Sequence, residues 1–212
     1  MKLDGKNIRF EELPCEEQVL TFDTLCQKLK ERIQIETFNQ DTLKTLNLYN
    51  STTGYNNAAG ILADKNHFPG IDMVRFGENI SVIHKRATFD HISILTVCEK
   101  GSEVFKDYYQ YEEIQGTERK KVEKIPEAAF REAIAYALIH RTWDAESQIK
   151  VSMFDDKIEI ISPGGTAFRN NRRRVFIGET FGFKKQKSCK CILQAGVCRN
   201  IWYRNYTDKT AL

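Results

Sequence analysis

Residues 125–165 read IPEAAFREAIAYALIHRTWDAESQIKVSMFDDKIEIISPGG, and this stretch decides the fold. Pro126 suits the first position of a helix, because its missing N–H costs nothing there, and Glu127 favours the positive end of the helix dipole. Apolar residues then recur at spacings of three and four, which predicts a helix over 126–141 with one face in a core. The apolar stripe consists of Phe130, Ala133, Ala137 and Leu138, flanked by Ile134 and Ile139. On the other side, Arg131 and Arg141 are expected to reach water.

A β-hairpin and a glycine turn follow this helix. Apolar and polar residues alternate over 148–153 and 157–161, and Asp155-Asp156 between them is typical of a turn, so the pattern predicts a half-buried antiparallel hairpin. Ser162-Pro163-Gly164-Gly165 ends the hairpin, because proline lacks a donor and glycine can take a positive φ. We therefore expect an α/β fold in which the helix packs on a mixed sheet that contains this hairpin.

The preceding segments predict further helices and strands. Amphipathic spacing predicts a helix over 22–35 and a shorter one over 41–48, capped by Asn39 or Asp41. Strands are expected over 71–76 and 80–83, with a turn at 77–79 between them. Residues 90–111 predict a helix interrupted near Gly101, and 112–124 a charged connection.

Composition limits the class of protein. The chain has 212 residues, 41% of them hydrophobic, which supports a core and one or two domains. It contains no run of about 18 apolar residues and does not open on an apolar signal segment, so we expect a soluble, cytoplasmic protein without a membrane partner. Its six cysteines are spread without a compact framework, which indicates reduced thiols.

The net charge of +3 is unevenly distributed. From Thr166 onward there are 11 Lys+Arg against 2 Asp+Glu, whereas residues 1–165 have 21 against 27. The basic character belongs to the tail alone. Basic residues interleaved with aromatic ones are typical of nucleic-acid binding, which is one interpretation of this tail.

An ordered series of motifs resembles a known family. The motifs are Asn57-Ala58-Ala59-Gly60-Ile61-Leu62, Phe68-Pro69-Gly70-Ile71, Val74-Arg75-Phe76, Glu132-Ala133, Ala137-Leu138, His140-Arg141, the hairpin 154–160 and the turn 162–165. Together they resemble the RecG-related bacterial transcriptional regulators, which carry a Schlafen/AlbA-type DNA-binding domain and then an ATPase-like domain of the gyrase and histidine-kinase class. The resemblance spans roughly Phe10 to Gly165.

The resemblance implies a division of the chain and its partners. Residues 1–57 would be a helical linker segment after a missing DNA-binding domain that lies before Met1. Residues 58–165 would be an incomplete ATPase-like α/β region, and 166–212 a basic tail. DNA is then expected as a partner of the missing domain, and a homo-oligomer is possible for such a module.

The same resemblance supplies candidate nucleotide-site residues. Glu132 and Tyr136 are four apart on one helical face, where ATPases of this class place a general base and a magnesium-binding asparagine. Because tyrosine is a poor magnesium ligand, ATP hydrolysis is not expected, although ATP and Mg²⁺ remain possible in intact relatives. The remaining cofactor-binding candidates are His140, Arg141, Gly164 and Gly165.

Each candidate also has a structural interpretation. Glu132 can be a surface or helix-capping carboxylate, and His140 and Arg141 can serve the helix end. Asp155-Asp156 can be turn chemistry rather than a metal site. The tail cysteines lack a fourth ligand for structural zinc.

Two functional classes follow. In the first, the chain is a fragment of a DNA-binding transcriptional regulator, with the ATPase-like region as regulatory or dimerisation module. In the second, it is an ATP-binding protein of the ATP-dependent, RecG-like DNA helicase kind. The first is favoured, because the chain has no phosphate loop of the motor-helicase type and has Tyr136 in place of asparagine.

The motifs stop abruptly after Gly165. Codons for Thr166 onward, shifted by one base, can encode a helix-like acidic start and a terminal Gly-Thr-Gly that continue the family pattern. We therefore hypothesise that 166–212 is out-of-frame translation, from a natural pseudogene or a sequencing error, and that this tail is poorly packed and leaves apolar surface beside Ile158 and Ile160 uncovered. The alternative is a genuine basic tail, and the gene's bases around Gly165 distinguish the two.

Overall fold

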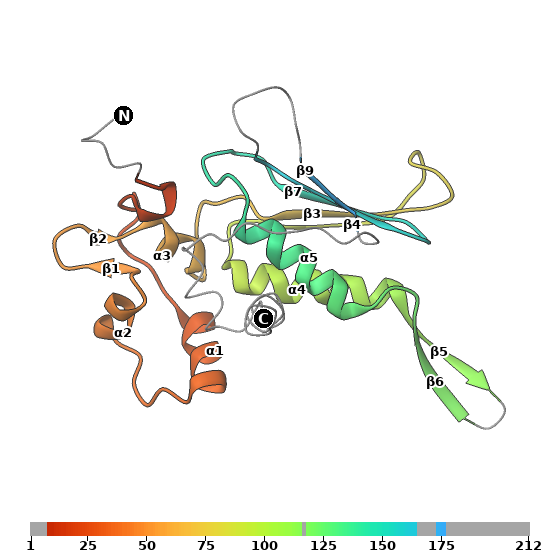
Figure 1. Cartoon of the computed structure of the whole chain (residues 1–212), viewed down its shortest axis with the longest axis horizontal. Coiled ribbons are helices and arrows are strands. Elements are labelled where there is room, and N and C mark those ends of the chain that lie inside the picture. The colour runs from red at the N-terminus through yellow and green to blue at the C-terminus, as the bar shows by residue number, and fades with distance from the viewer. Residues whose placement is uncertain (1–7, 116–117, 165–172, 177–212) are drawn as a thin grey trace, which may run out of the picture.

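The protein has two layers, a sheet and the helices that cover one of its faces (Figure 1). The computed structural model describes residues 8–115, 118–164 and 173–176. The sheet has five strands in the order β4-β3-β7-β8-β9, and β3 pairs with β7 in parallel while the other pairs are antiparallel. Helices α4 (Ile94–Tyr109) and α5 (Glu127–Ile139) lie on it. The predicted α/β fold with a mixed sheet and packed helices is confirmed.

The central helix and hairpin form as the sequence predicts. The N-cap of α5 is Pro126, one position earlier than expected, and its buried residues include Phe130, Ile134, Ala137 and Leu138. The strands that follow are β7 (Ile149–Met153) and β8 (Ile158–Ser162). Ala133 is only half-buried, so the core stripe is centred on Ile134 rather than flanked by it.

Helix α4 is continuous, so the expected interruption near Gly101 is wrong. Gly101 is buried, and a Cβ there would lie 3.0 Å from Ile71 Cδ1 of strand β3 (Ile71–Phe76). The glycine therefore lets the helix approach the sheet closely and does not break it. Ser93 caps the start of the helix by accepting a hydrogen bond from the Leu95 N–H.

The N-terminal part contains η1 (Phe10–Glu12), α1 (Asp23–Ile33), α2 (Gln40–Thr45), the short strands β1 (Tyr49–Asn50) and β2 (Gly54–Tyr55), and α3 (Asn57–Leu62). Asn39 caps α2 in a capping box, as predicted, although α2 ends at Thr45 and not at residue 48. A single hydrophobic core continues from Phe22 and Leu25 to Ile160 of the sheet. The expected boundary between residues 57 and 58 falls at the first residue of α3.

Two hairpins differ from their sequence predictions. Strand β4 covers Ile83–Phe89, so the strand expected over 80–83 is wrong and Ile80 lies in a turn. The charged connection is itself a two-stranded hairpin, β5 (Gln110–Gln115) and β6 (Glu118–Glu123), which projects away from the two layers (Figure 1). The sequence does not reveal this hairpin, because most residues of both strands are charged or polar, and Tyr111, Ile114 and Val122 are too few to form an alternating apolar pattern.

Most of the tail, and with it the out-of-frame hypothesis, lies outside the described residues. Arg173–Phe176 form β9, which pairs with β8. Ile158 and Ile160 are buried, so the expectation that apolar surface beside them stays uncovered is wrong. Within the described residues, no helix combines the length and apolar character needed to cross a bilayer.

Candidate functional site

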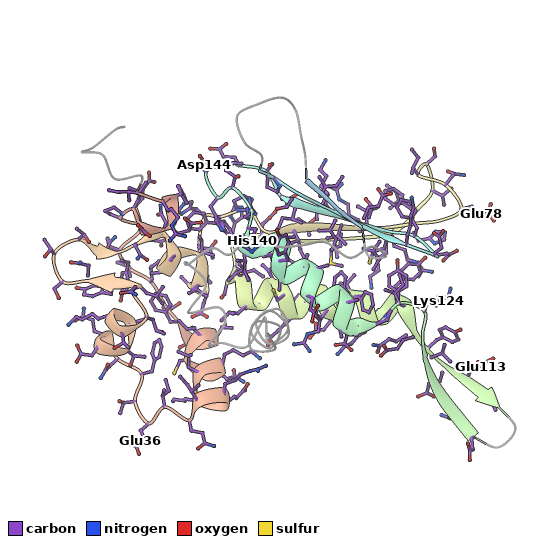
Figure 2. The ribbon with its side chains drawn as sticks, in the orientation of Figure 1. Glu36, Glu78, Glu113, Lys124, His140 and Asp144 are labelled. Carbon is purple, nitrogen blue, oxygen red and sulfur yellow. The ribbon has the colours of Figure 1, made fainter. Side chains whose placement is uncertain are left out.

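The predicted site residues on α5 share one face. Glu132, Tyr136 and His140 follow one another at intervals of four residues, so their side chains lie in a row along the helix. All three are half-buried. The Tyr136 and His140 rings are 4.3 Å apart between centroids and tilted by 44°. The C-terminal part of this face is therefore an aromatic pair next to the helix end, where Figure 2 labels His140.

Glu132 is the acidic member of this face. Within the described residues, no hydrogen bond or ion pair of its carboxylate is found. Glu127, by contrast, forms an ion pair with Lys106, at 3.0 Å between Oε1 and Nζ. Burial, the largest influence, raises the pKa of Glu127, but the hydrogen bonds from Lys106 and Gln110 outweigh it and the pKa is lowered. Glu127 therefore supplies the acidic side chain in the first turn of α5, and Glu132 does not have that function.

Arg141 is buried, so the expectation that it reaches water is wrong. Its side chain is 3% exposed and donates to three backbone carbonyls, at 2.6 Å to Pro69 O, 2.7 Å to Ser147 O and 3.2 Å to Ala145 O. The guanidinium also lies 4.5 Å from the Trp143 ring centroid. Burial lowers the pKa of Arg141 to about 10, which still leaves it charged at neutral pH.

These contacts give Arg141 a structural position. Pro69 precedes β3, and Ala145 and Ser147 precede β7, so one side chain joins the end of α5 to the entries of two adjacent strands. The structural interpretation of Arg141 is favoured over phosphate contact, because its Nη donors are already used by carbonyls.

The glycine turn after β8 is joined to the end of α5. Ser162 Oγ donates to Ala137 O at 3.0 Å, and the Thr142 N–H donates to Pro163 O at 2.9 Å. Gly164 has φ +142°, and a Cβ there would lie 2.6 Å from Thr142 Oγ1, so only glycine fits. The structure thus brings Gly164 to the same end of α5 as His140, whereas Gly165 lies outside the described residues. Sequence reasoning missed Thr142 and Ser162, which hold this turn.

The other acidic candidates serve the hairpin between β7 and β8. Tyr108 donates its hydroxyl to Asp155 Oδ1 at 2.6 Å, which ties the turn to α4. This hydrogen bond is the main cause of a lowered pKa for Asp155. No group of three His, Cys, Asp or Glu with metal-binding geometry occurs in the part of the chain that the structure describes. Asp155 therefore has a structural partner in Tyr108.

A cavity of about 410 Å³ opens between α1, α4 and α5. From α5 it is lined by Glu127, Arg131 and Ile134, which lie on a different face from Glu132 and Tyr136. Lys28 pairs with Glu99 across it, and Lys106 with Glu127. The predicted site residues do not line this cavity.

The fold is shared with a solved structure. It is the DIP2311 protein from Corynebacterium diphtheriae, which superposes with a TM-score of 0.61 at 18% sequence identity over 74% of this chain. The chain spans 34% of the length of that protein. No protein-family model and no curated protein sequence matches. At this identity the likeness shows the fold alone.

The residues on α5 do not fit a bound magnesium ion. Magnesium requires compact oxygen ligands in octahedral geometry, and Tyr136 offers an aromatic ring packed on His140 where the family resemblance would have an asparagine carbonyl. Glu132 alone cannot hold the metal together with a nucleotide phosphate. The face has a half-buried carboxylate at Glu132 and the Tyr136–His140 ring pair. The Gly164 turn lies at the same end of α5 as His140.

Proposed function

We propose that this chain is a segment of a DNA-binding transcriptional regulator related to the RecG-like family, in which the α/β region is a regulatory or dimerisation module that does not hydrolyse ATP. The observation that carries the proposal is the Tyr136–His140 ring pair on α5. By the resemblance, Tyr136 would stand at the position where an ATPase of the gyrase and histidine-kinase class has its magnesium-binding asparagine. The order of helix, hairpin and glycine turn on one continuous fold supports the family assignment.

DNA binding would belong to the Schlafen/AlbA-type domain that members of this family carry. We place the protein in the cytoplasm, where a regulator meets DNA and where thiols such as those of Cys15 and Cys26 stay reduced. Reading the bases before the Met1 codon tests the DNA-binding part. An in-frame Schlafen/AlbA-type segment is expected there, and an unrelated reading frame would contradict it.

The alternative is an ATP-binding protein of the RecG-like helicase kind. The partner-free carboxylate of Glu132, within the described residues, is the observation that favours it, because a general base for water must be accessible. Under this alternative the protein hydrolyses ATP in a magnesium-dependent reaction.

An ATPase assay and a calorimetric titration with ATP, each with and without Mg²⁺, separate the two functions. We expect neither turnover nor magnesium-dependent binding in the natural chain. Magnesium-dependent turnover that disappears in Glu132→Gln but persists in Glu112→Gln, a matched change at an exposed site far from α5, would overturn the proposal.

A further inference from the structure

The cavity between α1, α4 and α5 has the features of a small-molecule site, and it lies on the helical side of the sheet (Figure 1). Its volume of about 410 Å³ is within the range of roughly 300–1,000 Å³ that such sites have. Part of its lining is apolar and buried, since Leu95 and Ile134 are each 1% exposed and Cys98 is also buried. Charged side chains from all three helices complete the lining.

Two ion pairs use four of these charged side chains. Lys28 of α1 pairs with Glu99 of α4, and Lys106 of α4 pairs with Glu127 of α5. Lys28 also approaches Glu31 of its own helix, at 3.8 Å between Nζ and Oε2. These pairs connect the three helices around the cavity and neutralise one another, so they do not attract a ligand of either sign.

The other charged side chains of the cavity are Arg32 of α1, Glu103 of α4 and Arg131 of α5. Among the residues that the structure describes, none of these three makes an ion pair or a hydrogen bond. Arg131 has an electrostatic influence on Glu127, but Glu127 is paired with Lys106. Two guanidinium groups therefore reach one cavity without a paired carboxylate, although Glu103 lines the same cavity.

The charge balance of the cavity is opposite to that of its surroundings. Residues 1–165 contain 21 Lys+Arg against 27 Asp+Glu, whereas the lining of the cavity has four basic and three acidic side chains. Two like charges next to an apolar wall repel each other more strongly than in open water, and a bound anion would remove this cost. Guanidinium groups bind carboxylate and phosphate through two parallel hydrogen bonds. The cavity is therefore suited to an anion with two acidic groups.

We propose that this cavity is an effector site for a small organic dianion, with carboxylate or phosphate groups bound by Arg32 and Arg131 and an apolar part against Leu95 and Ile134. Such a ligand would join α1 to α5 and so stabilise one arrangement of the helices. The inference deepens the regulatory role proposed above and, as an effector site, rests on it. The site is separate from the Glu132–Tyr136 face, because neither residue lines the cavity.

Calorimetric titration of the full chain with two probes tests this site. The probes are succinate and inorganic pyrophosphate, which separate a carboxylate from a phosphate ligand, at constant ionic strength in a buffer with EDTA and no Mg²⁺. We expect at least one probe to bind at one site per chain and to raise the midpoint of thermal unfolding as its concentration rises. Binding of neither probe overturns the inference.

Removal of either guanidinium locates the bound probe. Arg32→Gln and Arg131→Gln should each raise the Kd by about tenfold or more, because each removes a charged hydrogen-bond donor. Arg119→Gln is the matched control, since Arg119 is exposed and lies outside the cavity, and it should leave the Kd unchanged. Binding that persists in both cavity variants, as it would if the basic tail held the anion, overturns the inference.

Removal of the unpaired carboxylate gives a result of opposite direction. Glu103→Gln should lower the Kd several-fold, because a negative charge beside the bound anion is lost. Glu146→Gln makes the same change at an exposed position outside the cavity and should have no effect. A Kd that is unchanged or higher in Glu103→Gln overturns the assignment of an anion to this cavity.

The outcomes separate this inference from the proposed function. Failure of both probes to bind overturns the effector site and does not change the ATPase measurement. Conversely, magnesium-dependent ATP turnover overturns the proposed function, whereas the probe titrations, made without Mg²⁺, stay as they are.

Discussion

Replacing Arg141 by methionine should destabilise the protein more than any change on the exposed face of α5. The substitution keeps most of the length and apolar volume of the side chain but removes all the donors. Three carbonyls, of Pro69, Ala145 and Ser147, then lose their charged partner. A buried acceptor left without a partner costs about 1–3 kcal/mol.

The extent to which the three carbonyl residues are buried determines the expected loss in the free energy of unfolding. Ser147 is exposed and Ala145 half-buried, so water can replace part of what their carbonyls lose. Pro69 is half-buried and makes the shortest of the three contacts, at 2.6 Å. We expect a loss of about 3–4 kcal/mol, a large part of the 5–15 kcal/mol by which a typical domain is stable.

Urea unfolding followed by far-UV circular dichroism measures this loss. With a slope of about 2 kcal/mol per molar urea, the midpoint should fall by roughly 1.5–2 M. Arg131→Met is the control, because it makes the same change at an exposed position of the same helix and should cost at most about 0.5 kcal/mol. Equal midpoints for the two variants would refute the structural role of Arg141.

Two further changes probe the core and the start of α1. Ala137→Leu should destabilise by about 1–3 kcal/mol through overpacking, since Ala137 is 1% exposed, whereas Ala128→Leu on the exposed side of α5 should be nearly neutral in the same urea assay. Asp64→Ala should cost about 0.5–2 kcal/mol at pH 7, because the Asp64 carboxylate accepts the Asp23 and Thr24 N–H groups at 2.6 and 2.9 Å and so caps α1. Burial, the largest influence, raises the pKa of Asp64, but the hydrogen bonds from Thr24 and Asp23 outweigh it and the folded pKa is lowered. The stabilisation by Asp64 should therefore be present above about pH 4 and be lost as the pH falls through the folded pKa. The free energies of unfolding of the wild type and of Asp64→Ala should converge at that low pH. A difference between them that stays constant with pH would contradict this.

The elements that the sequence predicts best are those in which local pattern and tertiary packing agree. Helix α5 and the β7–β8 hairpin have clean periods of about 3.6 and 2, and each buries the face that its period selects. Asn39 caps α2 because its side chain needs only neighbouring N–H groups. Such features depend on few residues that are close in sequence.

The errors arise where a distant contact decides the outcome. Gly101 resembles a helix breaker until Ile71, thirty positions earlier, is seen packed against it. The cap of α1 comes from Asp64 because Phe22, the N-cap residue, has no side-chain acceptor. Neither contact is visible in a local window of the sequence.

The candidate site shows the same division. The spacing of four residues predicts that Glu132 and Tyr136 share one face, and the structure adds His140 to that face through its ring contact with Tyr136. The glycine turn expected after the hairpin is present, with Gly164 at φ +142°. The partners that hold the turn, Thr142 and Ser162, have no signature of their own, because a hydroxyl near a helix end serves many purposes.

His140 and Arg141 are adjacent candidates for cofactor binding, but the structure gives each of them a different role. His140 and Arg141 are neighbours in sequence, but α5 ends at Ile139, so His140 is the C-cap of the helix and Arg141 lies beyond it. His140 packs on Tyr136 at the candidate site, whereas Arg141 turns inward to the carbonyls before β3 and β7. The Ile149 N–H donates to Gly70 O between those same two strands, so Arg141 holds the place where the parallel pair begins. A loss of Arg141 should therefore loosen the start of the parallel strand pair, next to Gly70 and Ile149.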